Sequence, residues 1–400
     1  MFGPGFAHYL SYGATDQDTV LQLAGTYTGL LVPGTVAAFQ REGTGGFVLT
    51  LSATPVSPEY VIDPRFPLFQ QALPKAKKSH EALAASVGAS ELVRTDEPQP
   101  EDFTDELIDT IASGWAEFNG SYRSSASGKF AKYAKRLGQP VDQTSAKAPA
   151  YVLAPYFTAS TKSDPWWSVS KRLFTATASK VSDIPCIRVV AAEKVGALGD
   201  LLSDVKDDRV AIWVSGLDEL KATSLELRHY ADTINRASAA GIKTFALYGG
   251  FYSVLMMNVG LGGSSHGIGY GEYRNWIELP TSGPPPKRYY LPQLHRYVQP
   301  DEAMRLFVAD PRLAQCMCEE CNGDPPLGLD YHAMMRHSVR CRAAEIRDWA
   351  GLTRVEMADR ISAELRDFLE VLDETDLPEV VLSRTQRLTV HLPRWSGALR

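Results

Sequence analysis

The segment AIWVS at residues 211–215 and the segment TFALY at residues 244–248 flank a longer stretch, Leu217–Ala240. Both short segments are apolar on successive residues, which is typical of a strand that is covered on both faces in a parallel sheet. We expect the stretch between them to be a helix, so the three segments form a β-α-β unit.

The same alternation of short apolar runs and helical stretches extends along most of the chain, and about eight such units predict a closed barrel. The fold class expected is therefore α/β, a (β/α)8 TIM-like barrel. Further expected strands are Gly29–Val32 or Gly46–Leu51, Tyr60–Asp63, Ala150–Tyr156, Cys186–Val190 and Gly267–Tyr270, with others near Tyr289–Leu294 and Arg384–Val390. Further expected helices are Asp105–Leu137, Lys194–Val205, Phe251–Val259, Tyr331–Trp349 and Arg354–Leu372.

Composition limits the class of protein. The 400 residues are 44% hydrophobic, which supports a large core. A net charge of −6 argues against a globally basic nucleic-acid binder, although a local basic groove remains compatible with it. No apolar run approaches the length of a membrane span, and the N-terminus lacks the features of a signal peptide. Clustered cysteines fit a reducing compartment, so we expect a cytoplasmic protein without a membrane partner.

The run CMCEEC at residues 316–321 indicates a metal site, because three thiolates at this spacing can converge on one tetrahedral ion. His337 and Cys341 lie one turn apart on an expected helix, so both can reach the ion. The alternatives are reduced cysteines in a loop and a disulfide, but three cysteines in six residues are too dense for core packing, and a disulfide would leave an odd thiol. The predicted ligands of a structural Zn²⁺ are Cys316, Cys318, Cys321 and His337, with His332 or Cys341 as alternatives for the fourth.

Chemistry in a barrel lies at the carboxyl ends of the strands. Asp63 ends an expected strand, and the alternative interpretation is an aspartate that caps the following turn. Gly216, Leu217 and Asp218 follow another strand, where acidic residues also suit the start of a helix. The glycine-rich stretch at residues 260–271 lets a base or a phosphate approach the backbone closely, or packs tightly at the rim.

That stretch also contains His266 and Tyr270 and leads into Glu272. We expect His266 to be a neutral hydrogen-bonding residue or a general acid or base. Glu272 is a candidate nucleophile or base, or the partner of Arg274. The segments 287–290 and 295–297 interleave Lys287, Arg288 and Arg296 with aromatic residues. They suit phosphate contacts and base stacking, and a solvated barrel edge explains them equally well.

A barrel that carries Cys-x-Cys-x-x-Cys and a downstream helical histidine resembles the tRNA-guanine transglycosylase superfamily. Val61–Gln70 is similar to an early strand of that family, which ends in an aspartate ahead of Phe-Gln, and Val214–Glu219 is similar to its Gly-Gly-Leu segment. Within that superfamily, the branch that we expect the chain to resemble most is the DpdA-like branch, which inserts 7-deazaguanines into DNA. The resemblance implies that Asp63 contacts the base and moves protons, that the segment with residues 216–218 binds the base, and that the three cysteines and His337 hold zinc. Tyr270 is a further candidate for binding the substrate.

The resemblance implies a base-exchange glycosyltransferase that replaces guanine in nucleic acid, DNA rather than tRNA, with a 7-deazaguanine base. Its expected partners are nucleic acid, the free base, and further copies of the chain or accessory proteins. No aspartate occurs between Asp232 and Asp301, where the family's nucleophile belongs, so Glu272 or His266 would act there. The alternatives are an inactive zinc barrel that binds nucleic acid or a protein, and a nucleoside or glycoside hydrolase that uses two carboxylates.

The expected domain organisation has three parts. A barrel covers residues 1–300, a zinc-binding subdomain covers 301–352, and a C-terminal helical segment covers 353–400.

Overall fold

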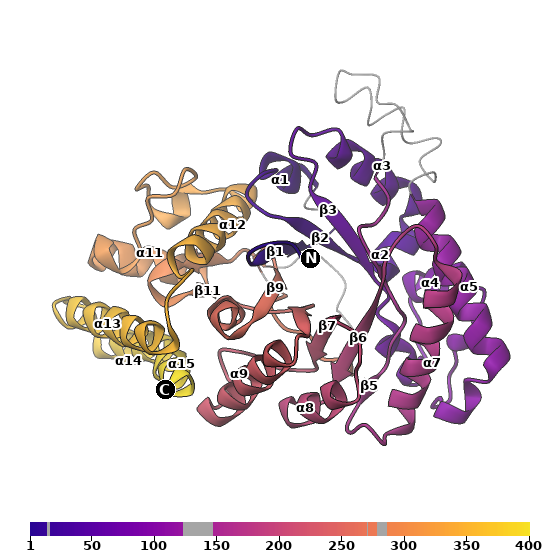
Figure 1. Cartoon of the computed structure of the whole chain (residues 1–400). Coiled ribbons are helices and arrows are strands. Elements are labelled where there is room, and N and C mark those ends of the chain that lie inside the picture. The colour runs from indigo at the N-terminus through magenta and orange to yellow at the C-terminus, as the bar shows by residue number, and fades with distance from the viewer. Residues whose placement is uncertain (14–16, 123–146, 270, 278–285) are drawn as a thin grey trace.

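The computed structural model describes residues 1–13, 17–122, 147–269, 271–277 and 286–400. It contains a closed barrel of eight parallel strands surrounded by helices (Figure 1), which confirms the expected (β/α)8 fold. The strands of the ring are β1 (Ala7–Ser11), β2 (Gly29–Pro33), β3 (Glu59–Asp63), β4 (Val152–Leu153), β6 (Cys186–Ala192), β7 (Arg209–Val214), β8 (Lys243–Ala246) and β9 (Leu261–His266). The short strand β5 (Thr158–Ala159) pairs with the end of β6 beside β4.

Two pairings close the ring. Strand β4 pairs with β6, with Val152 opposite Cys186, and strand β1 pairs with β9, with Ala7 opposite Gly263. Gly263 is required at the second closure, because a Cβ at this position would lie 2.4 Å from the carbonyl oxygen of Ala7. The first and last strands therefore approach each other closely only because this residue has no side chain.

Helices cover the outside of the ring, and large apolar side chains fill its inside. Tyr9, Leu31, Val61 and Phe245 belong to one buried cluster inside the ring, as expected for a packed barrel interior. Among the described residues, the helices between the strands are α1 (Gln17–Gln22), α2 (Gly34–Phe39), α3 (Arg41–Ser52), α4 (Lys78–Ser86), α5 (Asp105–Ser121), α7 (Pro165–Lys180), α8 (Val195–Ser203), α9 (Ser224–Ala239) and α10 (Phe251–Leu255).

After β9 the chain leaves the barrel before it returns to it. It forms an antiparallel hairpin of β10 (Tyr289–Leu291) and β11 (Arg296–Val298), then helix α11 (Pro300–Ala309), the cysteine loop and helix α12 (Tyr331–Asp348). Met335 and Val339 of α12 pack into the same core as Val20 of α1, beside the first strand (Figure 1). Helix α12 therefore takes the place of the helix that follows the last strand of a barrel.

The C-terminal part is helical, with α13 (Arg354–Asp373), α14 (Glu379–Leu388) and α15 (His391–Leu399). Helix α15 lies between α13 and α9, so the end of the chain packs on the barrel (Figure 1). No helix within the described ranges is both long enough and apolar enough to cross a lipid bilayer.

Several expected elements were wrong in detail. Residues 46–51 lie in helix α3, and residues 384–388 lie in helix α14, because a short apolar run alone does not distinguish a strand from a helix. The glycine-rich strand is Leu261–His266 and ends where Gly267–Tyr270 was expected to begin. The strand at residue 289 belongs to the hairpin outside the ring, and the sequence did not indicate β1.

Candidate metal centre and rim pocket

The cysteine loop is a tight turn built by backbone hydrogen bonds. The amide of Asn322 donates to the carbonyl of Cys318 at 2.8 Å, and the amide of Gly323 donates to the carbonyl of Cys316 at 3.0 Å. Asn322 and Gly323 both have positive φ values, 46° and 86°, which glycine and asparagine tolerate best. The chain thus folds back on itself and turns the three thiols of the CMCEEC run toward one point.

Helix α12 supplies the fourth side chain. The side chain of Asp330 caps the helix by accepting from the amide of Ala333 at 2.7 Å, and His337 follows in the second turn. The carboxylate of Glu320 accepts from Nε of Arg336 at 2.8 Å and from Nε of Arg340 at 3.1 Å. These two ion pairs fasten the cysteine loop to the helix.

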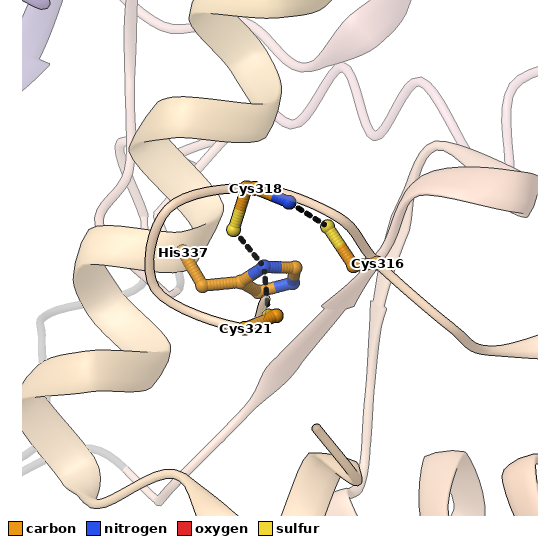
Figure 2. Close-up of side chains that lie close together, drawn as sticks. All are labelled: Cys316, Cys318, Cys321 and His337. Atoms are coloured by element: carbon orange, nitrogen blue, oxygen red, sulfur yellow. Dashed lines mark hydrogen bonds between the residues drawn. The ribbon is translucent and has the colours of Figure 1, made fainter. Parts of the chain in front are cut away.

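The four donor atoms of Cys316, Cys318, Cys321 and His337 all lie within 4.8 Å of one another (Figure 2). Nδ1 of His337 lies 3.4 Å from the sulfur of Cys318 and 3.2 Å from that of Cys321. The other ring nitrogen, Nε2, lies 2.6 Å from the carbonyl oxygen of Tyr290, which fixes the tautomer with its proton on Nε2. The lone pair of Nδ1 is therefore free for an ion, and this cluster could hold a metal.

The two alternative fourth ligands differ. His332 lies outside the cluster, and its Nδ1 is 2.9 Å from the hydroxyl of Thr19 on α1. Cys341 lies beside the cluster, with its sulfur 3.7 Å from that of Cys316 and 3.5 Å from Nδ1 of His337. Of the two alternatives, Cys341 is therefore the one that lies next to the four predicted ligands, as a buried fifth donor.

Asp63 lies at the carboxyl end of β3, as expected, and is completely buried. Its Oδ1 accepts from the hydroxyl of Tyr156 at 2.8 Å and from the amide of Arg65 at 3.0 Å. Its Oδ2 accepts from the hydroxyl of Tyr248 at 2.7 Å and lies 3.5 Å from Nε of Arg65. Asp63 therefore caps the next turn, as the alternative interpretation expected, and it also holds side chains from two other strand ends. A role in chemistry stays a prediction.

A small pocket lies over these tyrosines. It is lined by Arg65, Pro67, Leu68, Tyr156, Trp213, Tyr248, Arg274 and Trp276. Burial raises the pKa of Tyr156 and of Tyr248, and the nearby Asp63 carboxylate raises both further. Both hydroxyls therefore remain protonated at neutral pH and donate to Asp63. The pocket combines aromatic walls with two guanidinium groups above a buried carboxylate.

Glu272 does not line this pocket. Its Oε1 accepts from Nη2 of Arg342 on α12 at 2.8 Å, and its Oε2 is close to Gly250 and to Glu219. Burial raises the pKa of Glu272 to about 7, although Arg342 opposes that shift. The sequence suggested Arg274 as its partner, and the structure places Arg342 there instead.

His266 ends β9, and it is also absent from the pocket lining. Its Nε2 lies 3.0 Å from the hydroxyl of Ser264, and its ring centre lies 5.0 Å from that of His8. Burial lowers the pKa of His266 well below its usual value, and the positive charge of Arg342 lowers it further. His266 is therefore a neutral imidazole buried in the barrel wall.

The other predicted base-binding residues lie at the rim between β7 and α9. The amide of Gly216 donates to the carbonyl of Arg274 at 2.8 Å, so a backbone segment covers it. Asp218 accepts from the amide of Leu220 at 3.1 Å and pairs with Lys221 at 2.9 Å, which makes it a turn residue. Leu217 packs against the outer core, and Tyr270 lies outside the described residues.

The three predicted phosphate-binding residues differ in exposure. Lys287 is exposed, and Arg288 is partly exposed beside a small hollow lined by Met334 and Met335. Nη1 of Arg296 donates to the carbonyl of Leu388 at 2.8 Å, so this guanidinium is engaged within the protein. Of the three, Lys287 and Arg288 are the ones open to an external phosphate.

Sequence reasoning missed most of the pocket. Tyr248 follows the end of β8, and Trp213 lies at the end of β7. Aromatic side chains at strand ends are therefore a signal in the sequence that would have identified both. Arg274 and Trp276 come from an irregular segment, and no local pattern marks them. Arg342 could not be found because its role depends on the return of α12 to the barrel.

No protein-family model matches this chain, and no curated protein is significantly similar to it.

Proposed function

We propose that the protein is a base-exchange glycosyltransferase that replaces guanine in nucleic acid with a 7-deazaguanine base, and that DNA is preferred over tRNA. The observation that carries this proposal is the rim pocket, whose Tyr156 and Tyr248 donate to the buried Asp63 at the carboxyl ends of the strands. Strand ends are where barrels place their chemistry. Trp213 and Trp276 supply aromatic surfaces of the kind on which a planar base stacks.

The reaction needs an extruded nucleotide, a carboxylate near its C1′ atom, and a proton donor for the leaving purine. Asp63 is the carboxylate on which we place this chemistry. Its two tyrosine partners are the proton donors that lie closest to it, and either one would have to turn away to free a carboxylate oxygen for the sugar. Asp63 itself lies behind the lining, but it accepts from two tyrosines that form it. Glu272 and His266 are not assigned to the reaction, because they bond to Arg342 and Ser264, and neither of those residues lines the pocket.

We also propose that the metal is zinc in a structural role. With a Zn–S bond and a Zn–N bond of ordinary length, a tetrahedral site places sulfur and nitrogen about 3.5 Å apart. The sulfur atoms of Cys318 and Cys321 lie 3.4 and 3.2 Å from Nδ1 of His337. Three thiolates and one imidazole fill the coordination shell and leave no open position for a substrate.

Nucleic acid as the partner is supported by charge at the pocket. In the part of the chain that the structure describes, no acidic side chain pairs with the guanidinium of Arg274, whereas Arg65 lies beside Asp63. An unpaired cation at the entrance suits a phosphate next to the extruded nucleotide. Lys287 and Arg288 would extend this contact along the strand, and accessory proteins or further copies of the chain would hold the rest of the duplex.

The test is incorporation of radiolabelled 7-deazaguanine bases into DNA and into tRNA. The wild-type protein should label DNA more than tRNA. Asp63→Asn should reduce labelling by at least about 100-fold, since a general acid–base or nucleophilic group is worth that much or more. The matched control is Asp183→Asn, which removes an exposed carboxylate that precedes β6 and does not line the pocket, and this variant should label normally. Normal labelling by Asp63→Asn would refute the assignment.

A second function is favoured by one specific observation. Asp63 is completely buried with hydrogen bonds to both of its oxygens, and Glu272 is held by Arg342, so neither carboxylate lines the pocket in which a substrate would bind. An inactive barrel that binds nucleic acid or a protein would look the same. Retention of DNA in a filter-binding assay, with no exchange of any base, would favour this second function over the first.

A further inference from the structure

The segment of residues 271–277 lies across the rim of the barrel and completes the pocket. The carbonyl of Arg274 accepts from the amide of Gly216 at 2.8 Å and from Nε1 of Trp213 at 3.2 Å. The amide of Trp276 donates to the hydroxyl of Ser215 at 3.1 Å. These bonds attach the segment to the end of β7, and they place two of its side chains in the pocket lining.

The other end of this segment is attached to helix α12. Glu272 pairs with Nη2 of Arg342 at 2.8 Å, and Nη1 of Arg342 pairs with Glu345 at 3.0 Å. The side chain of Arg342 is only 3% exposed and that of Glu272 is 16% exposed. An ion pair this deeply buried is costly to break from one side, because the remaining charge is then left without a partner.

The same helix face leads to the metal centre. Glu345 accepts from the hydroxyl of Tyr290 at 2.7 Å, and the carbonyl of Tyr290 lies 2.6 Å from Nε2 of His337. The ring of Tyr289 stacks on the ring of His337, with centres 4.5 Å apart. A continuous series of contacts therefore runs from the metal ligands through Tyr290, Glu345 and Arg342 to Glu272.

We propose that Glu272 and Arg342 are positioning residues, whose buried ion pair holds the rim segment in place and makes the pocket dependent on the metal centre. Neither residue lines the pocket. Arg342 is fixed by the metal-holding helix, and Glu272 transfers that position to Arg274 and Trp276. The inference uses the pocket of the proposed function but does not depend on base exchange.

The experiment follows the environment of Trp276 by its fluorescence. The contribution of this residue is the difference between each protein and its Trp276→Phe counterpart, measured as quenching by iodide. In Glu272→Gln the quenching constant should rise by about twofold or more, the lower end of the coupling found between physically connected sites. The zinc content should stay at one ion per chain, because the four ligands are untouched. Removing zinc with a chelator should raise quenching in the wild type and add little in Glu272→Gln.

The matched control is Glu302→Gln, since Glu302 on α11 also pairs with an arginine, Arg384, and its side chain is only 9% exposed. This variant should leave the Trp276 signal and its response to chelation unchanged. Arg342→Lys keeps the charge and should give an intermediate signal, which covers the case in which Glu272→Gln does not fold.

An unchanged Trp276 signal in folded Glu272→Gln, or an equal response of both proteins to chelation, would overturn the inference. If the signal moves as expected but no base is exchanged, only the proposed function fails.

Discussion

The metal centre and the rim pocket differ in how far apart in the sequence their residues lie. The four residues that could hold the metal fall between 316 and 337, and one loop and one helix present them. The pocket residues fall between 65 and 276 and come from the ends of several strands and from the irregular segment of residues 271–277. Spacing along the chain is enough to predict the first site, whereas the second exists only after the barrel has closed.

The largest effect should come from a ligand of the metal centre. Cys321→Ala should lose the metal and unfold the cysteine loop together with α12, because the site forms only with the ion bound. We expect a loss of more than about 5 kcal/mol in the free energy of unfolding of that region, a part of the apparent binding energy of structural zinc. Elemental analysis and protection of the α12 amides from hydrogen exchange measure both effects. Cys186→Ser, outside the cluster, should keep its metal.

Asp63→Ala should have the next largest effect on stability. It leaves the hydroxyls of Tyr156 and Tyr248 and the guanidinium of Arg65 buried without their acceptor. Removing one partner of such a group costs about 3–5 kcal/mol, which urea denaturation would detect. Asp63→Asn keeps an acceptor and should cost less. Equal stability of the wild type and Asp63→Ala would mean that these contacts contribute little.

Predictability differs between the two regions for a physical reason. The alternation of strands and helices predicted the barrel. The Cys-x-Cys-x-x-Cys run and a helical histidine predicted the cluster. Both predictions were possible because the signals are local in the sequence. Asp63 was placed correctly because it ends a recognisable strand. The partner of Glu272 was not predictable, since Arg342 is 70 residues away and reaches it only through the return of α12.

The pH dependence of stability tests the contact between Glu272 and Arg342, which joins the rim segment to the helix of the metal centre. Burial raises the pKa of Glu272 to about 7 in the folded protein, while Arg342 opposes the shift and Glu219 adds to it. In the unfolded chain the pKa returns to about 4.3. The folded state therefore binds the proton of Glu272 more tightly than the unfolded chain does. The contribution of this proton to the free energy of unfolding is complete below the unfolded pKa and is lost as pH rises through about 7.

Glu272→Gln cannot titrate. The unfolding free energy of the wild type minus that of Glu272→Gln should therefore fall between pH 5 and pH 8, by an amount on the order of 2–3 kcal/mol. Urea denaturation at several pH values measures this difference. A difference that stays constant, or rises with pH, would contradict the raised pKa.

The smallest effect should come from the fifth thiol. Cys341→Ser should retain the metal, because Cys316, Cys318, Cys321 and His337 form a complete set. Loss of the buried sulfur should cost only about 1 kcal/mol in thermal stability, as for a small packing change. His332→Ala should likewise keep its ion, because its ring contacts Thr19 instead. Loss of the metal from Cys341→Ser but not from His337→Ala would reverse the choice of the fourth ligand.

The pairing of β1 with β9 has a consequence for how the chain folds. Ala7 and Gly263 are partners in this pairing, so the contact spans most of the barrel sequence. Contacts of such long sequence separation carry a large loop-closure entropy and slow the search for the native topology. A ribosome-bound chain that ends before residue 261 would expose the unpaired edges of β1 and β8, which are open to association with other chains. The period of greatest risk of aggregation therefore falls late in synthesis, just before the last strand emerges.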